Sequence, residues 1–113
     1  MNNLDKEIVE WHKKTFPKAT IENQLLKLDE EIGELCDAIK QGSDNHAVKE
    51  MADVYIVARV LSDRFKSQIG NYFLGLIDEY PVPHLIDEVK KKMETNKNRV
   101  WEYKNGVYHH KEG

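Results

Sequence analysis

The segment Met51–Leu61, apolar on nearly every side, restricts the fold of this chain more than any other. A helix that is apolar all round has to be buried, so the stretch from about 44 to 65 is predicted to be the central helix of a helical domain. Glu50 and Asp53 occupy one stripe of that helix, where a plain core would have Leu or Ile. Because a buried ionised carboxylate is costly unless it is paired or bound to a metal, the two acids require a partner.

The preceding segment supplies a second pair of acids, Glu31 and Glu34. It is predicted to be a helix with Thr20 as its N-cap and Gly42 at its end. Its apolar residues recur in steps of three and four: Leu25, Leu28, Ile32, Leu35 and Ile39. Residues three apart share one helix face, so two antiparallel helices would bring the four carboxylates together.

Four carboxylates at close range predict a hard divalent cation among them. Mg²⁺ is expected, with Mn²⁺ as the alternative, because all-oxygen ligation suits hard cations and no His or Cys stands at a ligating spacing. A carboxylate-bridged di-iron site is the rival interpretation. Such a site normally uses Glu-x-x-His, and none of the five histidines has a Glu three residues before it.

The rest of the chain predicts further helices and one hairpin. Helices are expected at about 4–14, over a short stretch around 72–77, and at about 83–96, the last with Leu85, Ile86, Val89 and Met93 facing inward. Asn105-Gly106 is the preferred type I′ turn and predicts a β-hairpin over about 100–110. We therefore predict an all-α antiparallel helical bundle with a short C-terminal β-hairpin, forming a single domain over 1–113.

Composition disfavours several classes of protein. The net charge of −3, without a face rich in Lys or Arg, disfavours nucleic-acid binding. The longest apolar run, Val54–Ala58, is far shorter than the ~20 residues of a membrane span, and no signal-peptide pattern is recognised. Cys36 is the single cysteine, which excludes an internal disulfide and fits a reducing cytoplasm; we interpret it as a small buried apolar group.

The acidic motif is also the signature of a known family. Glu30–Leu35 has the sequence Glu-Glu-Ile-Gly-Glu-Leu, and fifteen residues separate Glu34 from Glu50–Asp53, Glu-Met-Ala-Asp. This pattern resembles the MazG-like all-α nucleoside triphosphate pyrophosphohydrolases. The likeness extends to the lead-in and to the tail of one branch: Trp11, Thr15–Pro17 and Thr20, then Lys92, Asn96, Arg99 and Trp101.

The resemblance implies a catalytic metal site and a reaction. It makes Glu31, Glu34, Glu50 and Asp53 the metal ligands. It further implies hydrolysis of a nucleoside triphosphate to the monophosphate and pyrophosphate, by a dimer or a dimer of dimers.

The residues themselves are compatible with that reaction. Because the chain has no Gly-x-x-x-x-Gly-Lys loop, phosphates have to be bound by the metal and by cationic side chains. Lys92 and Arg99, with Asn96 beside them, are the candidates, and a solvated basic helix end is the competing interpretation. Glu30 is expected to be solvated rather than to activate water. Trp11 is expected to pack in a core or interface rather than to stack on a base.

Two alternative functions stay open at this point. One is a non-catalytic helical interaction or nucleotide-sensing module whose acids hold a structural metal. The other is a deoxyuridine nucleotide hydrolase of the same superfamily, which would also accept a diphosphate.

Overall fold

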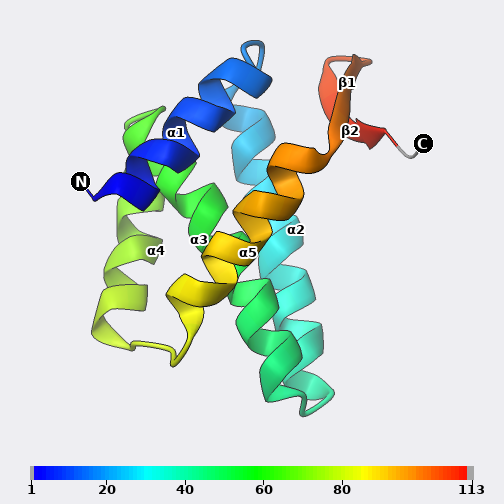
Figure 1. Ribbon diagram of the computed structural model, residues 1–113. Coiled ribbons are helices and arrows are strands. Elements are labelled where there is room, and N and C mark those ends of the chain that lie inside the picture. The colour runs from blue at the N-terminus through cyan, green and yellow to red at the C-terminus, as the bar shows by residue number, and fades with distance from the viewer. Residues whose placement is uncertain (1, 112–113) are drawn as a thin grey trace.

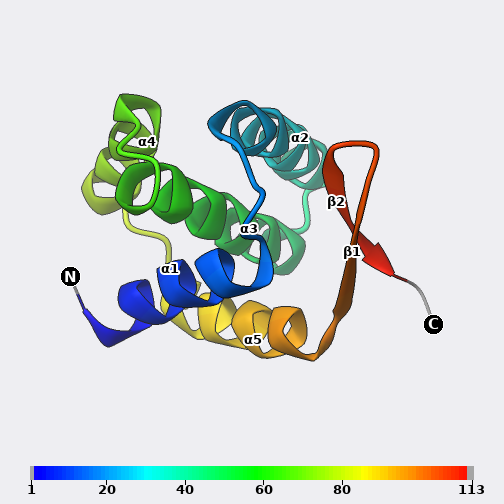
Figure 2. The same cartoon turned by 90° about the horizontal axis from the view of Figure 1, so that it is seen from above.

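The computed structural model describes residues 2–111 as helices followed by one hairpin (Figure 1). The elements in chain order are α1 (Asn3–Thr15), α2 (Ile21–Lys40), α3 (Asp44–Asp63), α4 (Gln68–Glu79), α5 (Leu85–Asn98), β1 (Val100–Lys104) and β2 (Val107–Lys111). Seen from above, α3 lies in the middle, with α2 and α4 on one side and α1 and α5 on the other (Figure 2). The predicted all-α bundle with a C-terminal hairpin is confirmed.

The central helix α3 is buried on two sides, as its sequence predicts. On one side Tyr55 and Ile56 pack with Ile8 of α1 and Val89 of α5. On the other side Val54, Val57 and Leu61 pack against Leu28 of α2. Each Leu, Ile or Val side chain fully removed from water stabilises the fold by about 1.5–3 kcal/mol. Residues of α3 belong to both apolar clusters, so burial of this helix contributes a large part of the stability. No helix within residues 2–111 has the length and apolar character needed to cross a membrane.

Side-chain caps define where the main helices begin. The Thr20 hydroxyl accepts a hydrogen bond from the Asn23 backbone N–H at 3.2 Å, which confirms the predicted N-cap of α2. Ser43 accepts in the same way from the His46 N–H at 3.3 Å and fixes the start of α3. The short α2–α3 connection contains Gly42, whose φ of 74° lies in the left-handed region that favours glycine. Together these caps set the antiparallel register of the two acid-bearing helices.

Helix α4 is longer than the short helix predicted for this stretch, because its close packing on α3 overrides the weak helix propensity of its glycines. Gly70 lies against α3, and a Cβ there would be 2.5 Å from the Ser62 nitrogen and 2.7 Å from the Ala58 oxygen. A residue without a side chain is therefore required for this approach.

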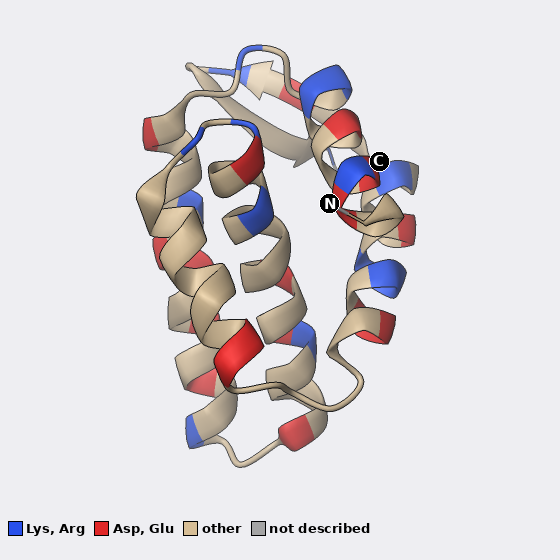
Figure 3. Cartoon of the chain, turned by 90° about the vertical axis from the view of Figure 1, so that its left-hand side faces the viewer, with Lys and Arg blue, Asp and Glu red and all other residues tan. Residues whose placement is uncertain are grey.

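Three residues expected to face inward are exposed. Cys36 is on the surface, and 61% of Ile39 and 44% of Ile86 are exposed. Because α2 packs chiefly on α3, only one narrow stripe of α2 is covered, and Cys36 and Ile39 lie off it. In α5 the buried stripe runs through Leu85 and the residues four and eight positions later, which turns Ile86 outward. Acidic and basic residues are interspersed along the helices (Figure 3).

The C-terminal hairpin has the predicted turn. Strands β1 and β2 pair in antiparallel register from Val100 opposite Lys111 to Lys104 opposite Val107. Asn105 and Gly106 have φ values of 56° and 77°, as a type I′ turn requires.

Two hydrogen bonds tie the hairpin to the connection between α1 and α2 and to the first turn of α2. The Lys18 backbone N–H donates to the Tyr108 hydroxyl at 3.0 Å, and the Asn23 side chain donates to the Gly106 carbonyl at 3.1 Å. The hairpin thus lies over the start of α2.

Candidate active site

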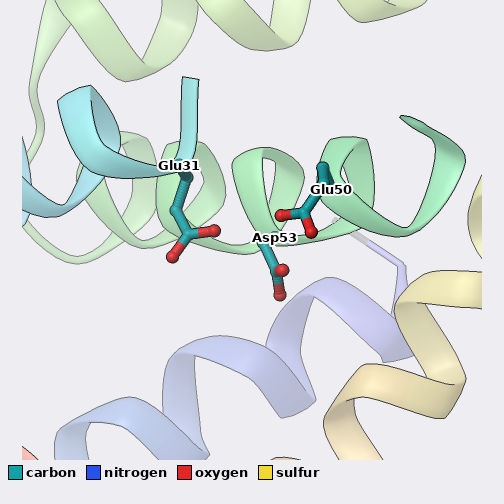
Figure 4. Close-up of side chains that lie close together, drawn as sticks. All are labelled: Glu31, Glu50 and Asp53. Carbon is teal, nitrogen blue, oxygen red and sulfur yellow. The ribbon is translucent and has the colours of Figure 1, made fainter. Parts of the chain in front are cut away.

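Helices α2 and α3 bring three carboxylates together. Glu31 of α2 and Glu50 and Asp53 of α3 each offer one oxygen, and these oxygens lie within 4.8 Å of one another. In Figure 4 the three side chains leave two neighbouring helices and project toward a common space. The convergence arises because the helices are antiparallel and each pair of acids has a three-residue spacing. The arrangement has the donor set of a hard-cation site.

Glu34, the fourth predicted ligand, is exposed and lies at the edge of this group. Its pKa is raised, first by partial burial and then by a hydrogen bond and charge repulsion from Glu50. Glu34 is therefore close enough to Glu50 to interact with it, although it is not one of the three convergent carboxylates.

Each of the three convergent carboxylates has a nitrogen partner 3.1 Å away. Lys27 Nζ contacts Glu31 Oε1, and His46 Nε2 contacts Glu50 Oε1. Lys92 Nζ of α5 contacts Asp53 Oδ2 across the bundle. Of these partners only Lys92 had been predicted as a site residue. Lys27 and His46 precede their acids by four residues, a spacing that indicates contact on a helix face, so the sequence did carry a signal for both.

These nitrogen partners do not satisfy the carboxylates fully. Glu31 Oε2 and Glu50 Oε2 are buried without a hydrogen-bond partner. Burial raises the pKa of Asp53 to about 6, although the Lys92 charge lowers it and the charges of the neighbouring Glu31 and Glu50 raise it further. The pKa of Glu31 is also raised, mainly by burial. Unpaired buried carboxylate oxygens are ligands that Mg²⁺ and Mn²⁺ prefer, so these residues fit a hard divalent cation.

The carboxylates lie at one end of a cavity of about 620 Å³. Lys92 and Asn96 of α5, four residues apart on one helix face, line it together with Arg99, the extended residue that follows the helix. The structure therefore brings the predicted metal ligands and the predicted phosphate-binding residues into one cavity. Aromatic side chains line its other part: Trp11, Phe16, Trp101 and Tyr108. A second, more open hollow between α1 and the end of α5 contains none of the four acids.

A comparison with protein families gives the site its context. The family model of the MazG nucleotide pyrophosphohydrolase domain matches residues 19–101. The chain belongs to this family. Members of the MazG family generally hydrolyse nucleoside triphosphates and typically depend on a divalent metal. No significant match was found among curated proteins or among solved structures.

The match covers the whole acid cluster of this MazG domain but not the whole cavity. The matched residues run from the connection before α2 to the start of β1, so they include all four acids and Arg99. Helix α1 and strand β2 lie outside the match, although Trp11 and Tyr108 contribute to the cavity wall. Glu30 also lines the cavity. It is exposed, as expected for a solvated side chain, and its Oε2 lies 3.9 Å from Lys27 Nζ.

Proposed function

We propose that this MazG domain hydrolyses a ribo- or deoxyribonucleoside triphosphate to the monophosphate and pyrophosphate, with Mg²⁺ or Mn²⁺ as its cofactor. One observation carries the proposal: the three convergent carboxylates open into a cavity whose adjoining wall is formed by Lys92, Asn96 and Arg99. A triphosphate needs a metal site at the reacting phosphorus and cationic or amide donors beside it. The cavity offers both within reach of one ligand.

The metal would be held by Glu31, Glu50 and Asp53, with Glu34 as a further ligand from the edge. A cation held there would neutralise charge on the phosphate oxygens and would make the attacking water a better nucleophile. The unpaired oxygens Oε2 of Glu31 and Glu50 support this assignment, because they have no other hydrogen-bond partner among the described residues.

The side chains of α5 would bind and orient the phosphates. Lys92 lies at the boundary between the acids and the rest of the cavity, since its Nζ is 3.1 Å from Asp53. Asn96 follows one turn later on the same helix, and Arg99 is the residue directly after the end of α5; both line the same cavity. They would hold the triphosphate so that a water oxygen bonds to the α-phosphorus. The bond from that phosphorus to the oxygen bridging the α- and β-phosphorus then breaks, pyrophosphate leaves with the bonding electrons, and the proton lost by the water passes to solvent.

We also propose that copies of the chain associate as a homodimer or tetramer in the cytoplasm. Large apolar side chains on the outer faces of α2 and α4 support an association: 69% of Leu26, 61% of Ile39 and 61% of Tyr72 are exposed. Light scattering coupled to size-exclusion chromatography gives the mass of the assembly, and a mass of one chain at micromolar concentration would exclude both forms.

Pyrophosphate release from a panel of canonical and modified nucleoside triphosphates, with and without Mg²⁺, tests the reaction. We expect Mg²⁺-dependent release that falls about 100-fold or more in Glu50→Gln, a loss of about 2.7 kcal/mol of transition-state stabilisation. Glu79→Gln, which changes an exposed acid at the end of α4, is the matched control and should keep full activity.

Two results would contradict the proposed reaction. If Mg²⁺ binds but no triphosphate is cleaved, the acids form a structural metal site in a non-catalytic module. If diphosphates are cleaved as readily as triphosphates, the protein is a hydrolase of the deoxyuridine nucleotide type.

A further inference from the structure

The cavity has an aromatic end that the acid cluster does not explain. Trp11, Phe16, Trp101 and Tyr108 line it, and we call these four side chains the aromatic recess. Three of them lie outside the residues matched by the family, and Trp101 is the last residue of the match. The recess is therefore built by α1, by the segment after it and by the C-terminal hairpin, and the family match includes only the first two residues of that hairpin.

The rings contact one another edge to face. The centroid of Phe16 lies 4.9 Å from that of Trp101 and 4.9 Å from that of Tyr108, with interplanar angles of 80° and 69°. Trp11 approaches Phe16 at 5.2 Å and 87°. Phe16 is buried, whereas Trp11, Trp101 and Tyr108 are only partly buried. Partly buried rings that line a cavity leave aromatic surface available to a flat ligand.

Several hydrogen bonds hold the recess in place. Arg64 of α3 reaches the end of α1, where its Nη1 donates to the Phe16 carbonyl at 2.9 Å and to His12 Nδ1 at 2.7 Å. The indole N–H of Trp101 donates to the Asn96 carbonyl at 3.3 Å, which connects the recess to the phosphate-binding face of α5. The bond from Lys18 to the Tyr108 hydroxyl fixes the hairpin side. These hydrogen bonds fix the recess from α3, from α5 and from the connection between α1 and α2.

A polar group adjoins the rings. Because Arg64 can only donate, His12 Nδ1 accepts its hydrogen bond, and the imidazole proton of the neutral ring is on Nε2. Burial and the Arg64 charge lower the pKa of His12 to about 3, whereas a side-chain hydrogen bond with Gln24 acts in the opposite sense, as a bond donated by His12 does. Gln24 also lines the cavity, beside the rings.

We propose that the aromatic recess binds the nucleobase and that the C-terminal hairpin is its recognition wall, an inference that rests on the proposed hydrolysis of a nucleotide in the same cavity. The acids and the recess occupy two parts of one cavity, and a volume of about 620 Å³ is within the range of small-molecule sites. Bases stack on aromatic rings whatever their identity, and the Gln24 amide N–H groups would donate to a carbonyl on the edge of the base.

Intrinsic tryptophan fluorescence tests this proposal directly. The chain has two tryptophans, Trp11 and Trp101, and both line the recess. Adenosine, guanosine, cytidine and uridine monophosphates are titrated into protein kept metal-free with EDTA, so that binding is measured without turnover. We expect saturable quenching by at least one of them, weakened about tenfold in Tyr108→Ala. Tyr108→Phe keeps the ring and loses only the hydroxyl bonded to Lys18, so it should bind within about twofold of the native protein.

A matched control and a kinetic measurement complete the test. Tyr80→Ala removes a tyrosine that is 68% exposed and does not line the cavity, and it should change neither quenching nor turnover. In the pyrophosphate assay, Tyr108→Ala should raise KM about tenfold and leave kcat within about twofold. Circular dichroism shows whether each variant keeps its helices, and where Tyr108→Ala unfolds, Tyr108→Leu removes the aromatic ring while keeping an apolar side chain and should show the same weakened quenching.

The outcomes separate this proposal from the proposed reaction. Quenching that Tyr108→Ala weakens, without cleavage of any triphosphate, supports the recess and overturns the hydrolysis. Glu50-dependent pyrophosphate release, with no quenching by any monophosphate and with an unchanged KM in Tyr108→Ala, supports the hydrolysis and overturns the recess. Loss of binding in Tyr108→Phe as complete as in Tyr108→Ala overturns the role of the ring.

Discussion

Asp53 couples the metal site to pH. Burial raises its pKa to about 6, so in the metal-free protein it gains a proton as the pH falls through 6. A metal has to displace that proton, and the apparent dissociation constant for Mg²⁺ should therefore rise by about tenfold per pH unit below pH 6. Titration calorimetry with Mg²⁺ between pH 5 and 8 measures this.

The Asp53→Asn variant isolates the contribution of that carboxyl. It should bind Mg²⁺ weakly at every pH, with a shallower pH dependence, because the amide has no proton to exchange. The pKa values of Glu31 and Glu34 are also raised, so these two groups account for the remaining pH dependence of Mg²⁺ binding in the variant. An affinity of the native protein that is equal at pH 7 and pH 5 would contradict the assignment.

His12 makes the fold sensitive to acid. Its folded pKa is about 3 and its unfolded value is near 6.5, so its contribution to stability is complete above pH 6.5 and is lost as the pH falls toward 3. Relative to His12→Asn, whose side-chain oxygen can still accept from Arg64, the native protein should lose about 2 kcal/mol between pH 7 and pH 5. Urea unfolding of both proteins at the two pH values measures the difference. An equal pH dependence in both would mean that His12 is not held neutral.

The site residues were predictable from the sequence where helix spacing decides their position. The four acids have three-residue spacings on adjacent helices, and Glu31, Glu50 and Asp53 do converge in the structure. The contact of Lys92 with Asp53 joins residues far apart in the chain, and its geometry depends on how α5 crosses α3. Tyr108 of the hairpin lines the same cavity. No spacing in the sequence predicts this, because only tertiary packing brings the hairpin to the cavity.

At the level of helices, Gly70 determines how closely α4 approaches α3. A methyl group there would lie 2.5 Å from a backbone nitrogen of α3, so Gly70→Ala should lower the free energy of unfolding by about 1–3 kcal/mol. Gly75 is the matched control in the same helix, since a Cβ there meets nothing within 4 Å. Gly75→Ala should stabilise the protein by up to about 1 kcal/mol through helix propensity. Thermal unfolding of both variants tests this, and destabilisation of equal size in both would contradict the packing argument.

Helix type and order followed from apolar periodicity, and the hairpin from Asn105-Gly106. The extent of α4 did not, because its glycines lower helix propensity while its packing on α3 favours the helix. The exposure of Ile39 also depends on tertiary structure: its three-and-four spacing predicts a buried position, but in the structure the buried residue at this end of α2 is Ala38. That the chain is a single domain stays a prediction.

Over the whole molecule, the acid cluster lies where α2, α3 and α5 meet, next to the apolar clusters on both sides of α3. A site of this kind binds a cation well and costs stability without one, since like charges repel and buried oxygens stay unpaired. Mg²⁺ should therefore raise the free energy of unfolding, by about 2.7 kcal/mol when its concentration is 100 times its dissociation constant.

Glu50→Gln should raise the stability of the metal-free protein and abolish its stabilisation by Mg²⁺. It removes one charge and one unpaired carboxylate oxygen, while its amide oxygen can still accept from His46, so the metal-free variant should be more stable than the native protein by about 1 kcal/mol. Its stabilisation by Mg²⁺ should be lost at the same time, whereas Glu79→Gln should behave like the native protein. Thermal unfolding with EDTA and with Mg²⁺ measures both effects. If Glu50→Gln were less stable without metal, Glu50 would be a structural residue whose charge the fold requires, and the stability of the cluster would not depend on a cation.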